Sequence, residues 1–224
     1  MSGYLKSYVA AAMEKDPAAT SKIMVLFTYP GVKALMWHRP ANWCYRHKMK
    51  FLARVISQHV RFWTGIEIHP GATIGKGVFI DHGAGVVIGE TAEVGNNVTL
   101  YQGVTLGGTG KDAGKRHPTI EDNVVIAAGA KVLGPFTVGK GSKIGAGSVV
   151  LKPVPENCTV VGVPGRIVKQ DGKRVDSLNQ VELPDPVLEE LRRINARLTQ
   201  IENLSGINCS RYSIANEENI KSTE

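Results

Sequence analysis

A branched aliphatic residue returns at every sixth position between residues 66 and 166, and this period constrains the fold more than any other feature of the chain. A six-residue step does not fit the stripe of an α-helix, and glycine interrupts the region too often for a simple alternating strand. The period predicts a parallel β-helix in which each hexapeptide forms one short strand and one turn, and three repeats complete a triangular coil. The residues expected to point inward and stack from coil to coil are Ile68, Ile74, Ile80, Ile88, Val94, Leu100, Leu106, Ile120, Ile126, Val132, Val138, Ile144 and Val150.

The repeat is interrupted twice. Eight residues instead of six separate Ile80 from Ile88, and fourteen separate Leu106 from Ile120. The second gap predicts a loop, residues 107–119, that leaves the coil. Insertions in solenoids often lie on the binding face. Polar residues that a bare scaffold does not need collect at these gaps, namely Asp81, His82, Glu90, Arg116 and His117.

An N-terminal helical domain, residues 1–64, is expected before the β-helix of residues 65–169. Three prolines, Pro17, Pro30 and Pro40, should break it into short helices. Its last segment has a helical pattern, with one face formed by Leu52, Val55, Ile56, His59, Val60 and Trp63.

Two further segments follow the β-helix. Residues 170–204 contain a linker and a helix whose apolar residues, from Val187 to Ile201, follow a heptad spacing. Residues 205–224 are polar and lack periodicity, so we expect a disordered tail.

Composition limits the compartment and the partners. The formal net charge of +7 suits an anionic ligand such as a coenzyme phosphate, and we rank nucleic acid lower because no basic run is interleaved with aromatic residues. Three cysteines without a metal spacing favour a reducing compartment. No apolar signal core or membrane-spanning stretch is visible. We therefore expect a cytoplasmic protein without membrane or nucleic-acid partners.

Prisms of hexapeptides host mainly two chemistries, so the fold alone does not decide the function. One is metal-dependent hydration, as in γ-class carbonic anhydrases, which need three histidines around zinc, two of them five residues apart. The histidines of the repeat region, His69, His82 and His117, include no such pair, and we predict no metal site.

The other chemistry is acyl transfer from an acyl-coenzyme A, for which the chain has better candidates. A neutral imidazole at His82 can accept a hydroxyl proton near neutral pH. Glu67 precedes His82 by fifteen residues, which is close to one coil, so it could orient the imidazole from a neighbouring rung. Taken alone, His82 could equally be an exposed turn histidine.

The chain contains several longer motifs, namely Gly65-Ile-Glu-Ile-His-Pro-Gly-Ala, Ile80-Asp-His-Gly-Ala-Gly-Val-Val-Ile-Gly-Glu-Thr-Ala, Val104-Thr-Leu-Gly-Gly-Thr-Gly, Lys115-Arg-His-Pro, Gly145-Ala-Gly-Ser-Val-Val and Gly162-Val-Pro-Gly-Arg-Ile-Val. With these motifs the chain resembles bacterial serine O-acetyltransferases over roughly three quarters of its length, from about Asp16 to Val168. The resemblance implies a left-handed β-helix. It also implies acetyl-CoA-dependent O-acetylation of L-serine, the first step of cysteine biosynthesis.

The same resemblance implies roles for individual residues. His82 is the general base, and Glu67 stands where many members of the family carry aspartate. Asp16 and Asp81 bind the serine ammonium, and Arg116 and His117 bind its carboxylate. The remaining implied roles are support of the site by Glu90, a pantetheine groove along Gly108 and Ala128, coenzyme phosphate binding by Lys143, and oxyanion binding by the backbone N–H of Gly108.

Alternatives remain at this point. Each charged residue, taken singly, could be a turn cap or a solvated surface charge. A different hexapeptide acyltransferase, acting on a sugar or an antibiotic, is the rival enzyme. Its acceptor would lack an ammonium and a carboxylate together, so it would not explain why Asp16, Asp81 and Arg116 occur together. A structural, partner-binding solenoid is the non-enzymatic rival.

The resemblance also sets expectations about partners. We expect a homotrimer with the site between neighbouring subunits, limited to a trimer because only fifteen residues precede Asp16, and L-cysteine as a feedback inhibitor. In the family, a C-terminal isoleucine docks into cysteine synthase. This sequence instead ends Lys221-Ser-Thr-Glu224, after Ile220, so we expect weak or no binding of cysteine synthase.

Overall fold

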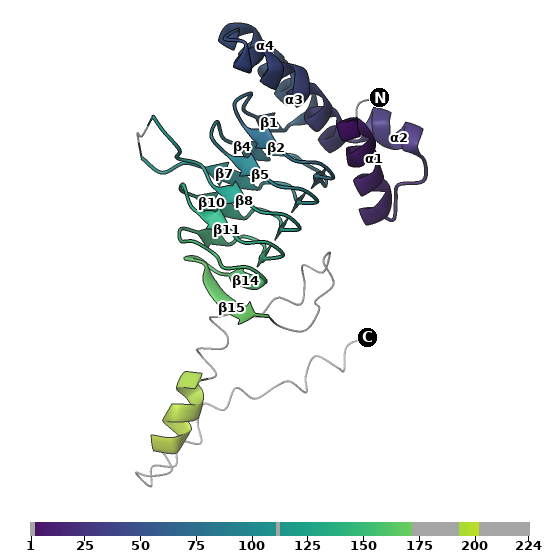
Figure 1. The fold of residues 1–224 in the computed structure, drawn as a ribbon. Coiled ribbons are helices and arrows are strands. Elements are labelled where there is room, and N and C mark those ends of the chain that lie inside the picture. Colours follow the sequence, from purple (N-terminus) through teal and green to yellow (C-terminus); the bar gives the residue numbers. More distant parts are fainter. Residues whose placement is uncertain (1–2, 111–112, 172–192, 202–224) are drawn as a thin grey trace. The chain divides into compact units, whose positions relative to one another are not determined.

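The computed structural model describes residues 3–110, 113–171 and 193–201 (Figure 1). Contacts divide the chain into one unit, Met1–Pro184, and a second, Asp185–Glu224. Within the second unit, residues 193–201 are helical, in the segment whose heptad spacing predicts a helix. The tail, residues 205–224, and most of the linker lie outside the described residues.

The first unit begins with four helices: α1 (Gly3–Lys15), α2 (Lys22–Thr28), α3 (Pro30–Arg46) and α4 (Lys50–Thr64). Pro17 follows α1 and Pro30 begins α3, as expected of helix boundaries. The expectation for Pro40 is wrong, because it lies inside α3. The helix continues through this proline because His38 and Asn42 hydrogen-bond to backbone carbonyls of the β-helix, so tertiary contacts offset the lost backbone hydrogen bond.

Helix α4 forms where its periodicity predicts it, but its predicted apolar face is only partly buried: Val60 packs against the core, while other residues of the face stay exposed. Leu52, Val55 and Trp63 are 46, 48 and 72 % exposed, whereas the buried positions of the helix are Ala53 and Ser57. The small residues Ala53 and Ser57 therefore face the rest of the fold, and several of the large apolar residues of α4 remain exposed.

Short strands follow the helices. They are β1 (Glu67–Ile68), β2 (Thr73–Ile74), β3 (Phe79–Ile80), β4 (Val87–Ile88), β5 (Glu93–Val94), β6 (Thr99–Leu100), β7 (Thr105–Gly107), β8 (Thr119–Ile120), β9 (Val125–Ile126), β10 (Lys131–Leu133), β11 (Thr137–Val138), β12 (Lys143–Ile144), β13 (Val149–Val150), β14 (Cys158–Val161) and β15 (Arg166–Gln170). Successive strands enter three parallel sheets in turn: sheet A (β1, β4, β7, β10, β13), sheet B (β2, β5, β8, β11) and sheet C (β3, β6, β9, β12, β14). This is the predicted β-helix; β15 pairs antiparallel with β14 at its end.

The core is a column of stacked aliphatic side chains. In sheet A, Ile68, Ile88, Leu106, Val132 and Val150 are successive register partners. Every anchor that the period predicts to be inside is at most 5 % exposed. Burying one such side chain stabilises the fold by roughly 1.5–3 kcal/mol. The hydrophobic period therefore sets the register of the whole prism.

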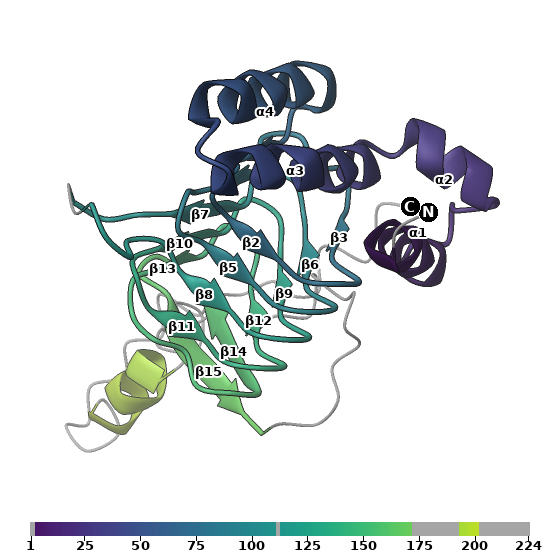
Figure 2. The same cartoon turned by 45° about the horizontal axis from the view of Figure 1, so that its top comes forward.

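The two interruptions of the repeat lie at different edges of the prism. We call the edge formed by the turns from sheet A to sheet B the A/B edge, and the edge formed by the turns from sheet C to sheet A the C/A edge. The long loop, between β7 and β8, leaves at the A/B edge, whereas the short insertion between β3 and β4 lies at the C/A edge (Figures 1 and 2).

Candidate active site

Asp81 and His82 follow β3 at the C/A edge. The His82 side chain is 74 % exposed, and its Nε2 lies 3.9 Å from Asp81 Oδ2. The backbone of His82 is left-handed, with φ of +56°. Non-glycine residues in this region are strained and cluster at functional sites. The turn thus presents an exposed imidazole beside a carboxylate.

Asp16 is brought to this edge by the end of α1. The preceding residue, Lys15, donates from Nζ to Thr99 Oγ1 at 2.8 Å, which ties the helix end to β6. The Asp16 carboxylate accepts two hydrogen bonds, from the Ala18 N–H to Oδ1 at 2.8 Å and from the Tyr29 hydroxyl to Oδ2 at 2.5 Å. The hydrogen bond to Asp16 is the main cause that raises the pKa of Tyr29 to about 12.

Asp16 and Asp81 interact electrostatically. Burial raises the pKa of Asp81 above its ordinary value, and the negative charge of Asp16 raises it further, while His82 acts in the opposite direction. Two neighbouring carboxylates with an imidazole beside them can bind a small cation such as an ammonium group. We call Asp16, Asp81 and His82 the C/A cluster.

Glu67, the proposed partner of His82, contacts α4 instead. Its Oε1 lies 3.8 Å from Arg54 Nη2 and 3.4 Å from Gln58 Nε2, and its Oε2 lies 3.4 Å from Arg61 Nε. No hydrogen bond or ion pair joins Glu67 to His82, both of which the structure describes. The structure brings Asp16, Asp81 and His82 together without Glu67.

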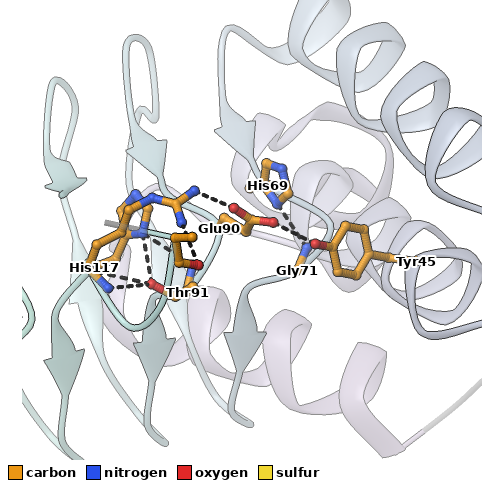
Figure 3. A network of polar contacts seen from close by, with 8 residues as sticks. Tyr45, His69, Gly71, Glu90, Thr91 and His117 are labelled. Carbon is orange, nitrogen blue, oxygen red and sulfur yellow. Dashed lines mark hydrogen bonds and ion pairs between the residues drawn. The ribbon is translucent and has the colours of Figure 1, made fainter. Parts of the chain in front are cut away.

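A second polar network occupies the A/B edge (Figure 3). Glu90, in the turn after β4, forms an ion pair with Arg116 from the long loop. The Tyr45 hydroxyl donates to the other carboxylate oxygen, Glu90 Oε1, at 2.5 Å. The hydrogen bonds from Tyr45 and Arg116 lower the pKa of Glu90. Glu90 is thus held as an anion that orients the Arg116 guanidinium.

Thr91 fixes the other end of this network. Its Oγ1 accepts the backbone N–H groups of Arg116 at 3.0 Å and His117 at 3.1 Å. Thr91 in turn donates its own N–H to His117 Nδ1 at 3.2 Å, and its Oγ1 lies 2.9 Å from the same nitrogen. An Nδ1 that accepts leaves the proton of the neutral imidazole on Nε2.

His117 is 9 % exposed, and burial is the main cause that lowers its pKa. Its ring packs against Gly89, where an added Cβ would lie 1.9 Å from His117 Cδ2. Only glycine permits this ring position. A neutral His117 therefore offers an Nε2–H donor beside the Arg116 guanidinium. We call Glu90, Thr91, Arg116 and His117 the A/B cluster.

This cluster borders an open pocket of about 290 Å³ lined by Tyr45, Gly71, Thr73, Glu90, Thr91, Ala92, Glu93 and Lys115. Lys115 Nζ lies 2.7 Å from Glu93 Oε1 and 2.8 Å from the Thr91 carbonyl oxygen, so it binds the loop to the turn after β4. The long loop is thus attached to the coil at its return end.

The two clusters do not meet within one chain. The C/A and A/B edges are separated by one face of the prism, on the order of 15–20 Å for a side of five or six residues. Ala128 lies at the C/A edge between β9 and β10, and Lys143 lies on β12 in sheet C. Gly108 begins the long loop beside Arg116, whose carbonyl oxygen lies 3.0 Å from where a Gly108 Cβ would be. The candidate residues thus divide between two edges.

Sequence reasoning missed Thr91 of the A/B cluster and two tyrosines, Tyr29 and Tyr45, that donate hydrogen bonds to cluster residues. Thr91 follows Glu90 in a motif that resembles the family, so this residue could have been found. Tyr29 and Tyr45 carry no spacing signal, because their partners lie 13 and 45 residues away in the sequence. Only the fold brings them to Asp16 and Glu90.

Two further findings concern the described ranges only. In residues 3–110, 113–171 and 193–201, no group of three or more His, Cys, Asp or Glu side chains is arranged to hold a metal ion. No helix in the same ranges is long and apolar enough to cross a membrane.

Comparison with known proteins agrees with the resemblance in the sequence. Residues 117–152 match the family described as bacterial transferase hexapeptide (six repeats). The serine acetyltransferase of Bacillus licheniformis is 59 % identical over 199 residues, which cover 88 % of this chain and 92 % of that protein.

Solved structures give the same result. A serine acetyltransferase of Brucella abortus in complex with coenzyme A is 46 % identical, with a TM-score of 0.73, and the match covers 75 % of this chain and 68 % of that one. A serine acetyltransferase in complex with cysteine is 41 % identical, with a TM-score of 0.77, covering 80 % and 70 %. These matches confirm the helical region followed by a left-handed β-helix. The chain belongs to the serine acetyltransferase family.

Proposed function

We propose that this protein transfers the acetyl group of acetyl-CoA to the hydroxyl of L-serine, which yields O-acetyl-L-serine and coenzyme A in the first step of cysteine biosynthesis. Membership of the family supports the reaction. The observation that carries the assignment to this site is the exposed His82 imidazole, held beside Asp81 at the same edge as Asp16.

His82 is the general base of the proposed reaction. Its imidazole removes the proton of the serine hydroxyl as that oxygen attacks the thioester carbonyl, because a free hydroxyl is too weak an acid to ionise near neutral pH. The oxyanion accepts a hydrogen bond from the Gly108 N–H. The intermediate then expels the coenzyme A thiolate, which receives the proton from His82. No acyl-enzyme is formed.

Glu67 remains our candidate for orienting and stabilising the protonated His82. In this role its carboxylate leaves the side chains of Arg54, Arg61 and Gln58 and turns toward the imidazole. Glutamate reaches one methylene farther than the aspartate found in many members of the family.

L-Serine is recognised by the opposite charges of its α-ammonium and α-carboxylate groups. Asp16 and Asp81 bind the α-ammonium group, and Arg116 and His117 bind the α-carboxylate, with Glu90 supporting Arg116. A sugar acceptor has neither charge, which makes a sugar acyltransferase the weaker alternative. Ala128 and Gly108 border the pantetheine arm, and Lys143 binds a coenzyme phosphate.

The catalytic unit of the proposal is a homotrimer. The C/A cluster of one subunit faces the A/B cluster of its neighbour, so each site uses both edges although they lie far apart within one chain. Three copies close this arrangement around one axis. We expect this trimer in the cytoplasm.

The proposal is tested by following release of the free thiol from acetyl-CoA with L-serine, other amino acids and sugars as acceptors. We expect L-serine to be preferred, and His82→Ala to lower kcat by roughly 10²–10⁴ because general-base catalysis contributes that much. Glu67→Gln should lower it less. A loss below about tenfold in a folded His82→Ala variant contradicts the assignment of the base.

Inhibition by L-cysteine follows from the same recognition. L-Cysteine has the ammonium and carboxylate of L-serine with sulfur in place of oxygen, and a related structure contains cysteine. In the thiol assay we expect inhibition competitive with L-serine. Full inhibition in a variant that lacks both Asp81 and Arg116 requires a separate site.

A further inference from the structure

Helix α3 carries a tyrosine at each end, and the two hydroxyls donate to carboxylates of different clusters. Tyr29, the N-cap residue, donates to Asp16 Oδ2 at 2.5 Å. Tyr45, near the C-terminal end, donates to Glu90 Oε1 at 2.5 Å (Figure 3). One helix therefore touches both edges of the prism at which the proposed substrate-binding residues lie.

The helix is fixed against the first coil between these two contacts (Figure 2). Gly31 lies so close to β3 that an added Cβ would be 2.2 Å from the Ile80 carbonyl oxygen. Farther along, Asn42 Nδ2 donates to the Pro70 carbonyl oxygen at 2.7 Å, and His38 Nε2 lies 3.2 Å from that of Ala72. These contacts make α3 a rigid support, roughly 25 Å long for its seventeen residues.

From this geometry we infer that Tyr29 and Tyr45 are positioning residues for L-serine: Tyr29 orients Asp16 toward the substrate ammonium, and Tyr45 orients Glu90 and thereby Arg116 toward the substrate carboxylate. The inference rests on the proposed function, from which it takes the roles of Asp16 and Arg116.

Each hydroxyl completes the hydrogen bonding of its carboxylate. Asp16 Oδ1 accepts the Ala18 N–H, and Tyr29 holds Oδ2, so both oxygens of Asp16 have a defined direction. Tyr45 holds Oε1 of Glu90, while Oε2 faces Arg116. Without the hydroxyl, the carboxylate can rotate and carry its partner with it. Hydrogen bonds to an ionised group are among the stronger ones in proteins.

The acidity of the two phenols agrees with this role. Hydrogen bonding to Asp16 is the first cause that raises the pKa of Tyr29 to about 12, and hydrogen bonding to Glu90 is the first cause that raises the pKa of Tyr45. Both phenols therefore keep their protons at neutral pH and remain hydrogen-bond donors.

Steady-state kinetics of Tyr29→Phe and Tyr45→Phe test the inference. We expect each variant to raise KM for L-serine by roughly three- to thirtyfold, with kcat within about twofold and KM for acetyl-CoA unchanged. Tyr8→Phe is the matched control, because it removes a hydroxyl that donates to the Gly75 carbonyl oxygen at 3.1 Å, outside both clusters. This control should leave all three constants unchanged.

Double-mutant cycles separate positioning from a structural effect. The effect of Tyr29→Phe on kcat/KM for L-serine should fall below about twofold in an Asp16→Asn background, and that of Tyr45→Phe should do so in a Glu90→Gln background. Each should persist in the other background, since the two clusters are far apart. A defect in packing would persist in both.

The outcomes distinguish the inference from the function. If the unmodified protein acetylates L-serine but both tyrosine variants change its KM by less than about twofold, or if the effects are equal in every background, the inference is wrong. If the unmodified protein releases no thiol with L-serine, the proposed function itself is wrong.

Discussion

At the scale of single residues, Asp81 shows how a binding residue can lower the stability of the fold. Burial raises its pKa, and Asp16 raises it further. A carboxyl group whose pKa is higher in the folded than in the unfolded state stabilises the fold below its unfolded pKa. That contribution to stability is lost as the pH rises through the raised pKa of the folded state. At neutral pH the ionised Asp81 therefore weakens the fold of the free protein, until a bound ammonium group compensates.

We accordingly expect Asp81→Asn to increase thermal stability relative to the unmodified protein, by an amount that grows as the pH rises from the ordinary pKa of 3.8 through the raised pKa of the folded state and then levels off. The same variant should bind L-serine more weakly. Thermal unfolding across this pH range measures the difference. The exposed Asp171→Asn is the control, and an Asp81→Asn difference that does not grow with pH contradicts the argument.

At the scale of structural elements, each coil contributes stability through its inward anchors. Leu106 on β7 is fully buried between its register partners Ile88 and Val132, whereas Leu151, just after β13, is 50 % exposed. Because each coil packs only on its neighbours, a cavity in one coil weakens both of its interfaces. A leucine side chain thus contributes much more to stability at position 106 than at position 151.

Leu106→Ala should lower the free energy of unfolding by about 2–5 kcal/mol, the usual cost of a large-to-small change in a core. Leu151→Ala should change it by no more than about 0.5 kcal/mol. Urea unfolding of both variants, at one protein concentration, gives the comparison. Equal effects would mean that the column of anchors does not carry the stability of the coil.

At the scale of the whole molecule, the division of the site between two edges predicts an oligomer. A trimer of 24.1 kDa chains has a mass of about 72 kDa and a hexamer about 145 kDa, which light scattering distinguishes. The exposed aromatic residues of α4, Phe51 at 85 % and Phe62 at 79 % exposure, are a second property that a single chain leaves unexplained.

Complementation between inactive subunits tests the shared site directly. His82→Ala and Arg116→Ala variants, unfolded together and refolded as mixed trimers, should regain about one quarter of the active sites, because a site is intact when His82 and Arg116 come from different variants. Each variant refolded alone is the control. No gain in the mixture means that both residues act within one chain.

The sequence by itself determined the prism and the residues that fill it. A six-residue period of aliphatic side chains has one compact solution, so the anchors from Ile68 to Val150 and the loop between Leu106 and Ile120 were all predictable. Local periodicity could also place α4, but it could not say that Leu52, Val55 and Trp63 would remain exposed, because their exposure depends on how the helix packs on the rest of the fold.

Only the tertiary structure decided the environment of the candidate site. Glu67 faces Arg54 and Arg61 because α4 lies over β1, which no spacing could show. Tyr29 and Tyr45 reach Asp16 and Glu90 because α3 crosses the first coil despite Pro40. Which side chain of a repeat is buried follows from the pattern within that repeat alone. Polar contacts between distant segments depend on how the helices pack on the prism. No local pattern determines that packing, because it depends on the fold as a whole.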